Sequence, residues 1–209
     1  MKKTFFLLAF GFIFSVQLFA AKIDGYFITK NHDTVNVTFK LPVGFISQIP
    51  NYQRIQYKIK YYDKFSGKKI TLLPADVLEI GFQYGNAVIK MLSRSNNFSN
   101  GPFSYSSHIF LRLEIDGPLK MFRYYYTQSS PGHFNGATGA MTGGYSYNVE
   151  QYVLQRGDEP LKWPRSWSFR KDMKEYFSDC PALVEMIDKR EFRKNEVEAI
   201  VEFYNSKCL

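Results

Sequence analysis

The chain has 209 residues, of which 18% are aromatic and 22% charged, and its formal net charge is +8. This length is enough for one domain with its own core, and we find no internal repeat and no long linker. The positive charge does not indicate nucleic-acid binding, because the sequence contains no nucleic-acid-binding motif.

The first 20 residues have the three-part layout of a secretory signal peptide. Lys2 and Lys3 form a basic start, residues 5–14 are apolar, and Ala20 is a small residue suited to cleavage. We therefore predict a signal peptide over residues 1–20, with cleavage after Ala21 as an alternative. An uncleaved anchor helix is a further alternative, although the apolar run is shorter than a bilayer requires. The expected product is periplasmic or secreted, with no transmembrane segment after cleavage.

Residues 21–162 show the alternation of apolar and polar side chains that is typical of half-buried strands. Pro74 is suited to open a single helical turn, and Gly85 with Asn86 to form a two-residue hairpin loop. The fold class is mainly β (α+β), an antiparallel meander curling into a barrel or a sandwich. The predicted strands are Gly25 to Lys30, Thr34 to Leu41, Ile55 to Tyr61, Lys68 to Leu73, Gly81 to Tyr84, Ala87 to Ser93, Ile109 to Ile115, Leu119 to Thr127 and Tyr145 to Gln155.

The segment from Gln128 to Gly144 shows neither a strand nor a helix pattern, and a loop of this length is either a binding element or simply mobile. Aromatic side chains lie in it and beside it, and such rings stack on sugars or contact a partner chain. Filling of the interior by the strand aromatics is the alternative. The candidate binding residues are Tyr124, Tyr126, Phe134, Tyr145 and Tyr147.

From Trp163 onward the apolar spacing becomes helical, which predicts about three short helices over residues 163–209. Candidate caps are Ser166 or Ser168 for the first helix, Asp179 for the second and Asn195 for the third. We expect Trp163 and Trp167 to seal the junction between sheet and helices, with an exposed aromatic platform as the alternative.

Both cysteines, Cys180 and Cys208, lie in this tail, and we expect them to form a disulfide in an oxidising compartment. A metal pair or a redox-active pair is the alternative. The tail contains no C-x-x-C motif and no histidine, so neither alternative gains support.

No catalytic motif is present. The sequence lacks G-x-S-x-G and H-E-x-x-H, and its three histidines lie in different segments without a local partner. A carboxylate-type hydrolase requires only two facing acids. The strand-borne candidates are Glu79, Glu114, Asp116 and Glu150, and cross-strand ion pairing explains them equally well. We predict no catalytic residue, no metal and no cofactor.

The excess of lysine and arginine lies in the β part, because acids and bases nearly cancel from Trp163 onward. Lys58, Lys60, Lys64, Lys68 and Lys69 belong to this excess. Such a surface favours acidic glycans, anionic lipid headgroups or other polyanions of the envelope, whereas an ordinary solvated sheet face is the alternative.

The end of the chain, with SDCP at 178–181 and IVEFYNSKC at 200–208, resembles small exported Bacteroidota proteins of unknown function. These proteins have a short β domain followed by a D-C-P element and a final Y-N and cysteine motif. The resemblance implies export and a Cys180–Cys208 bridge, and it transfers no catalytic residue.

Two functions follow as hypotheses. The first is a non-catalytic binding protein of the bacterial envelope whose partner is a glycan, an anionic envelope component or a protein. The second is a carboxylate-type hydrolase acting on an extracellular polysaccharide, which requires Glu114 and Glu150 to converge near the tyrosine-rich segment.

Overall fold

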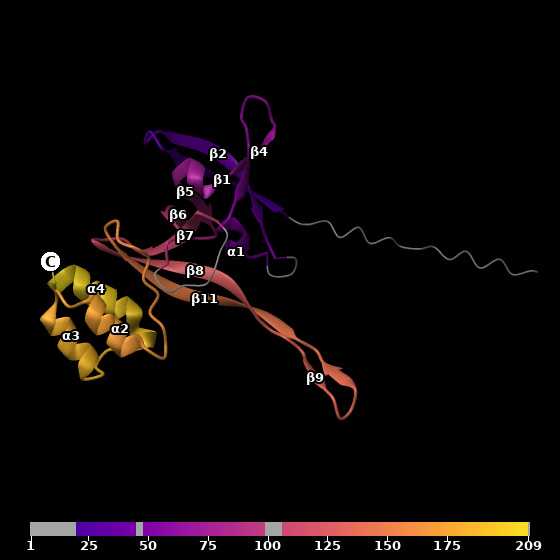
Figure 1. The fold of residues 1–209 in the computed structure, drawn as a ribbon. Coiled ribbons are helices and arrows are strands. Elements are labelled where there is room, and N and C mark those ends of the chain that lie inside the picture. The colour runs from indigo at the N-terminus through magenta and orange to yellow at the C-terminus, as the bar shows by residue number, and fades with distance from the viewer. Residues whose placement is uncertain (1–19, 45–47, 99–105, 209) are drawn as a thin grey trace, which may run out of the picture.

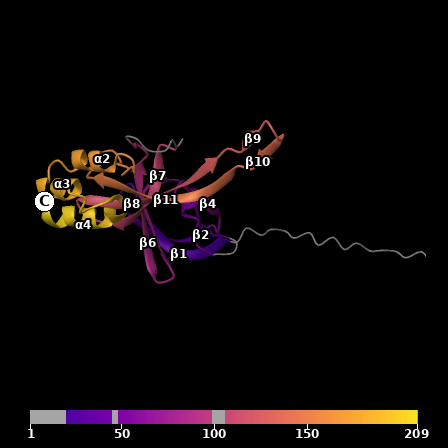
Figure 2. The same cartoon turned by 90° about the horizontal axis from the view of Figure 1, so that it is seen from below.

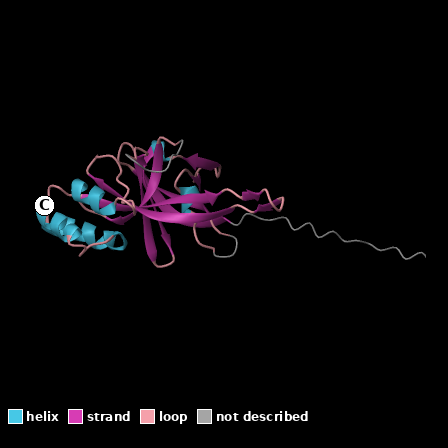
Figure 3. Cartoon of the chain, turned by 60° about the horizontal axis from the view of Figure 1, so that its bottom comes forward, coloured by secondary structure: helices cyan, strands magenta, loops and turns pink. Residues whose placement is uncertain are grey.

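The computed structural model describes residues 20–44, 48–98 and 106–208. The predicted signal peptide lies outside these residues except for Ala20. Strands dominate the described part (Figure 3). The strands are β1 (Ala20–Thr29), β2 (Thr34–Pro42), β3 (Ile59–Tyr62), β4 (Lys69–Leu72), β5 (Val77–Tyr84), β6 (Ala87–Ser95), β7 (His108–Ile115), β8 (Leu119–Ser130), β9 (His133–Asn135), β10 (Ala140–Thr142) and β11 (Tyr145–Arg156). The α-helices are α1 (Tyr52–Ile55), α2 (Phe169–Tyr176), α3 (Pro181–Asp188) and α4 (Val197–Lys207). Two 3₁₀ turns are η1 (Pro74–Asp76) and η2 (Lys194–Glu196).

Nine strands form one antiparallel sheet in the order β11-β8-β7-β6-β5-β1-β2-β3-β4. Two meanders, β1 to β4 and β5 to β8 with β11, are joined by the pairing of β1 with β5, and β9 and β10 form a separate two-stranded sheet. The mainly β, antiparallel prediction is confirmed. The barrel alternative is wrong, because β4 and β11 remain the two edges of an open sheet, and the fold is sandwich-like.

The alternating pattern of β2 has the predicted effect. Val37, Phe39 and Leu41 are buried in the core, while the residues between them lie on the opposite face. The β5–β6 hairpin turns at Gly85, whose φ of 59° lies in the left-handed region that favours glycine. Tyr84 and Ala87 face each other across this turn, as predicted.

The predicted strand from Ile55 to Tyr61 is wrong in its first half. The side chain of Asn51 accepts a hydrogen bond from the Arg54 amide and caps the short helix α1, so the strand begins only at Ile59. Ile55 and Ile59 are both buried, one from a helix and one from a strand. Both positions fit the alternating pattern, which is why the pattern missed the helix.

The three C-terminal helices are present, and they pack on one end of the sheet (Figure 1). Leu119, Met121 and Leu154 of β8 and β11 contribute to the cluster that these helices bury. Among the described residues, no helix is both long and apolar enough to cross a bilayer.

Two of the predicted helix caps are wrong. Ser168 precedes α2 as predicted. Cys180 and not Asp179 precedes α3, because Pro181 takes the first helical position that suits proline. The 3₁₀ turn η2 contains Asn195 and moves the start of α4 to the position after Glu196.

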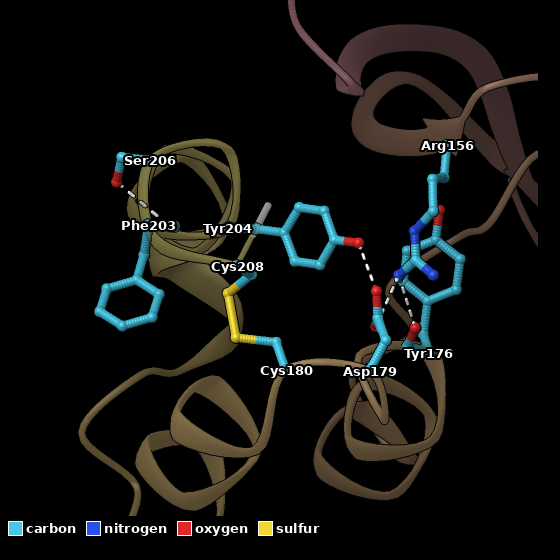
Figure 4. Close-up of a disulfide and its surroundings, with 8 residues drawn as sticks. All are labelled: Arg156, Tyr176, Asp179, Cys180, Phe203, Tyr204, Ser206 and Cys208. Atoms are coloured by element: carbon cyan, nitrogen blue, oxygen red, sulfur yellow. Dashed lines mark hydrogen bonds and ion pairs between the residues drawn. A yellow bond between two sulfur atoms is a disulfide. The ribbon is translucent and has the colours of Figure 1, made fainter.

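The predicted disulfide between Cys180 and Cys208 is confirmed, with Cα atoms 5.4 Å apart (Figure 4). It joins the start of α3 to the end of α4. Beside it, the Tyr204 hydroxyl donates a hydrogen bond of 2.5 Å to Asp179, and Arg156 donates one of 3.2 Å to the same carboxylate. Burial and the Asp179 hydrogen bond raise the pKa of Tyr204 to about 12. Because Cys180 and Cys208 are bonded to each other, neither offers a thiolate to a metal. The bond lies in the apolar cluster of the helical tail, where its role is structural.

At the start of β8, the side chain of Asn205 from α4 forms the backbone hydrogen bonds that a neighbouring strand would otherwise form. Its side chain accepts a hydrogen bond from the Leu119 amide and donates one to the Leu119 carbonyl, both of 2.9 Å. Because Asn205→Ala leaves both backbone groups without this partner, we expect the free energy of unfolding to fall by about 1–3 kcal/mol in urea denaturation. The control is Ser206→Ala, whose exposed hydroxyl donates a hydrogen bond to the Phe203 carbonyl one turn earlier in the same helix. Equal stability of the two variants would contradict this role for Asn205.

Candidate functional site

Strands β8 and β11 continue beyond the body of the sheet as a two-stranded arm. Their pairing extends from Arg156 opposite Leu119 to Tyr145 opposite Ser130, and β9 and β10 form a small hairpin beyond it. The arm projects away from the helical tail in both views (Figures 1 and 2). The prediction of an irregular loop from Gln128 to Gly144 is therefore wrong. Small and polar residues pair here as strands without the apolar alternation that reveals a strand.

A buried glutamine anchors the root of the arm. The pairing of β7 with β8 ends at Arg112 opposite Arg123, and the two strands separate there. Gln56, which is fully buried, occupies the gap. Its side chain accepts from the Tyr125 amide at 3.0 Å and donates to the Tyr125 carbonyl at 3.1 Å. Its own carbonyl accepts from the Phe110 amide at 2.9 Å, so one residue connects both strands where they part.

One face of the arm has a row of aromatic rings. Tyr145 and Tyr147 lie two residues apart on β11, 65% and 47% exposed, with centroids 6.0 Å apart and planes inclined by 20°. Tyr126 of β8 pairs with Val149 and therefore shares this face. The ring of Trp163 lies 5.5 Å from that of Tyr126. We call Tyr145, Tyr147, Tyr126 and Trp163 the aromatic row.

The remaining predicted binding residues lie elsewhere. Tyr124 lies next to Tyr126 on the same face but is only 1% exposed, because it stacks on Tyr126 at 6.0 Å and Phe98 packs edge-on against it at 5.2 Å, so it cannot contact a ligand. Its place among the candidate binding residues is corrected for that reason. Phe134 lies near the tip of the arm, 67% exposed and paired with Met141.

Trp163, which was expected at the sheet–helix junction, is half-buried, and its ring lies edge-on against those of Tyr126 and Phe98. Trp167 is 80% exposed, and the Arg165 guanidinium lies 5.0 Å over its ring. Tyr126 pairs with Val149, two residues from Tyr147, so the register of β8 and β11 places Tyr126 on the row. The sequence indicates the period of two but not this register.

The arm that bears the three tyrosines of the row carries no formal charge. No Lys, Arg, Asp or Glu occurs between Arg123 and Glu150. On the face of the row, hydroxyl and amide groups take their place, since Gln128 and Ser130 are the strand partners of Tyr147 and Tyr145. Burial, and then the neighbouring Tyr147, raises the pKa of Tyr126. Tyr126 is therefore a neutral phenol at physiological pH.

The strand-borne carboxylates are engaged in ion pairs. Glu114 and Glu150 do converge, but on the guanidinium of Arg123, which donates to Glu114 at 3.0 Å and to Glu150 at 2.8 Å. Burial lowers the pKa of Arg123, and the hydrogen bonds to the two carboxylates outweigh this effect and raise it. An acid catalyst needs a proton and an open path to the substrate, whereas an arginine fills the space between this pair.

The other two acids are also paired. Glu79 accepts from the Tyr26 hydroxyl at 2.7 Å and lies 3.6 Å from the ammonium of Lys90, and Asp116 pairs with Lys120. In the part of the chain that the structure describes, no cluster of three metal-ligating side chains occurs. Comparison of the chain with protein-family models, with curated proteins and with solved structures finds no match.

Proposed function

We propose that this protein is an exported, non-catalytic binding module that holds a neutral polysaccharide chain along the aromatic row. The observation that carries the proposal is the exposed, nearly parallel pair Tyr145 and Tyr147 on an arm without formal charge. Tyrosine offers a rigid, amphipathic contact surface at low entropic cost, and serine, glycine and asparagine add adaptable hydrogen bonds.

A sugar ring matches this surface in chemistry. Its C–H groups form an apolar face that packs on an aromatic ring, and its hydroxyls reach hydroxyl and amide partners at the ring's edge. Ser130 is the direct strand partner of Tyr145 and Gln128 that of Tyr147, so both polar side chains share the face of the row. Successive rings in a line favour a chain of sugars over a single small molecule. The absence of charged side chains favours a neutral chain.

Export is part of the same proposal. The disulfide is of a kind that persists in oxidising compartments, and the first residues have the layout of a leader. The ion-paired arrangement of Glu114, Arg123 and Glu150 supports a binding function over the hydrolase alternative.

Affinity gel electrophoresis tests the proposal, with laminarin, xyloglucan, galactomannan and dextran each cast into a native gel. We expect at least one of them to retard the wild type. The double variant Tyr145→Ala/Tyr147→Ala loses two stacking surfaces of about 1 kcal/mol each, so its dissociation constant rises about 10- to 30-fold.

The matched control is Phe65→Ala, which removes a fully exposed ring at the β3–β4 turn, away from the arm. It should be retarded like the wild type. The variant Tyr145→Phe/Tyr147→Phe keeps the rings and should retain most of the affinity. Retardation by none of the four polysaccharides, or equal retardation of the double alanine variant and the wild type, would overturn the proposed function.

A further inference from the structure

A second surface lies at the root of the arm, where α1 and the chain on either side of it face the N-terminal strands. A cavity of about 800 Å³ opens there. Cavities of this size hold small-molecule ligands in other proteins. Its lining includes five cationic side chains, which we call the basic pocket: Lys40, Arg54, Lys58, Lys60 and Lys69.

No carboxylate compensates this charge. The lining contains no Asp or Glu, and none of the five cations has an ion-pair partner among the described residues. Elsewhere in the described chain, four lysines do have such a partner, namely Lys90, Lys120, Lys174 and Lys189. The basic pocket is therefore a local excess of positive charge in a concave surface, and a concave surface strengthens the potential that attracts anions.

The strand register places like charges side by side. Lys40 of β2 lies directly opposite Lys60 of β3, and Lys22 of β1 lies directly opposite Lys40. Directly opposed like charges destabilise a sheet. An anion bound between Lys40 and Lys60 would relieve this repulsion and add charge-assisted hydrogen bonds.

The basic pocket and the aromatic row lie on different faces of the arm. Asn148 lines the pocket and Tyr147 belongs to the row, and consecutive residues of a strand point to opposite faces. Gln53, another lining residue, donates at 2.7 Å to Thr127, which shares the face of Asn148. The two surfaces can therefore be occupied and tested independently.

We propose that the basic pocket binds a compact anion that carries several phosphate, sulfate or carboxylate groups. Several cations around one cavity match several negative groups on one molecule. Four of the five cations are lysines. A lysine ammonium is a point charge, so it does not distinguish phosphate, sulfate and carboxylate groups by their geometry. The concave shape favours a compact ligand over the flat surface of a membrane. The source is either a free small molecule or the charged end of a glycan.

Isothermal titration calorimetry at low ionic strength tests the proposal, with sodium tripolyphosphate and sucrose octasulfate as probes and sucrose as the neutral comparison. We expect one-to-one binding of at least one anion, no binding of sucrose, and marked weakening in about 0.5 M NaCl. In Lys40→Gln/Lys60→Gln the dissociation constant should rise tenfold or more. Thermal stability without ligand should not fall, because the substitution removes a repulsion.

The matched control is Lys64→Gln/Lys68→Gln, which removes the same charge at the β3–β4 turn outside the pocket lining. Equal loss in both double variants would show a non-specific charge effect and overturn the site, as would a lack of binding to both anions. A chondroitin sulfate oligosaccharide that binds more tightly than sucrose octasulfate would identify a glycan as the source, and the reverse order a free small anion. A further outcome is that the wild type binds phosphatidylglycerol vesicles but neither small anion, and that Lys40→Gln/Lys60→Gln loses the vesicle binding. This outcome would overturn the proposed anion site and indicate a membrane contact instead.

These outcomes are separate from those of the proposed function. The aromatic variant Tyr145→Ala/Tyr147→Ala should bind the anions like the wild type. The lysine variant Lys40→Gln/Lys60→Gln should be retarded by the neutral polysaccharide like the wild type.

Discussion

Replacing Gln56 by leucine is expected to lower the free energy of unfolding by about 2–5 kcal/mol, although the two side chains are similar in size. Leucine leaves the amide and the carbonyl of Tyr125 without the two hydrogen bonds that Gln56 supplies. The site is fully buried, so each unpaired group carries its desolvation cost. Urea denaturation followed by circular dichroism measures the effect.

Two further variants make this test specific. Gln53→Leu is the control, since the Gln53 side chain bonds to Thr127 at an exposed position, and we expect a loss of about 0.5 kcal/mol or less. Gln56→Glu keeps the acceptor for the Tyr125 amide but loses the donor to its carbonyl, so it should be destabilised as well. A Gln56→Leu protein as stable as Gln53→Leu would contradict the anchoring role of Gln56.

The second large effect is expected from the double variant Cys180→Ser/Cys208→Ser, with a loss of about 3.5 kcal/mol on the chain-entropy estimate. The disulfide spans 28 positions and joins the two helices that form much of the tail cluster. Reduction of the wild type should lower its urea midpoint to that of the variant, as measured in parallel denaturation curves with and without reductant.

The helical tail should open first in the reduced protein. Hydrogen exchange is then expected to become faster in α3 and α4 than in β1 and β2, because the N-terminal core contains none of the tail residues. An unchanged urea midpoint after complete reduction would refute the stabilising role of the bond.

Much of the sheet could be predicted because apolar residues alternate where one face is buried. Strand β2 and the β5–β6 turn illustrate this, whereas the strand predicted over Gly81 to Tyr84 is too short, because β5 already begins at Val77 and its buried residues do not alternate. Residues 51–58 could not be predicted, since the alternation of Ile55 and Ile59 fits a strand, while the helix depends on the cap at Asn51. The function of Gln56 depends on the separation of β7 and β8, which no local pattern encodes.

The candidate site was predictable in part. Tyr145 and Tyr147 are recognisable as aromatics beside a segment of small polar residues, and both are exposed. The three consecutive tyrosines of β8 are ambiguous, because at the root of the arm both faces are covered. Tyr52 stacks on Tyr125, and Phe98 packs on Tyr124. The pairing of distant segments, and not the pattern within β8, decides which of these rings reaches solvent.

The basic pocket could likewise be predicted only in part from the sequence. The sequence reveals an excess of lysine in the β part, which is compatible with an ordinary solvated face. The concave arrangement depends on α1, which brings Arg54 beside the lysines of β2 to β4. A charge count therefore predicted the sign of the surface but not its shape.

The most direct test of the central claim is an NMR titration of backbone amides with an oligosaccharide cut from the polysaccharide that retards the protein most. The proposed function predicts shifts confined to the aromatic row and the strands that bear it, in residues 126–130 and 144–149 and at Trp163, with the amides of the basic pocket's lysines unchanged. Shifts centred on the basic pocket or on the helical tail, with the arm unchanged, would contradict it.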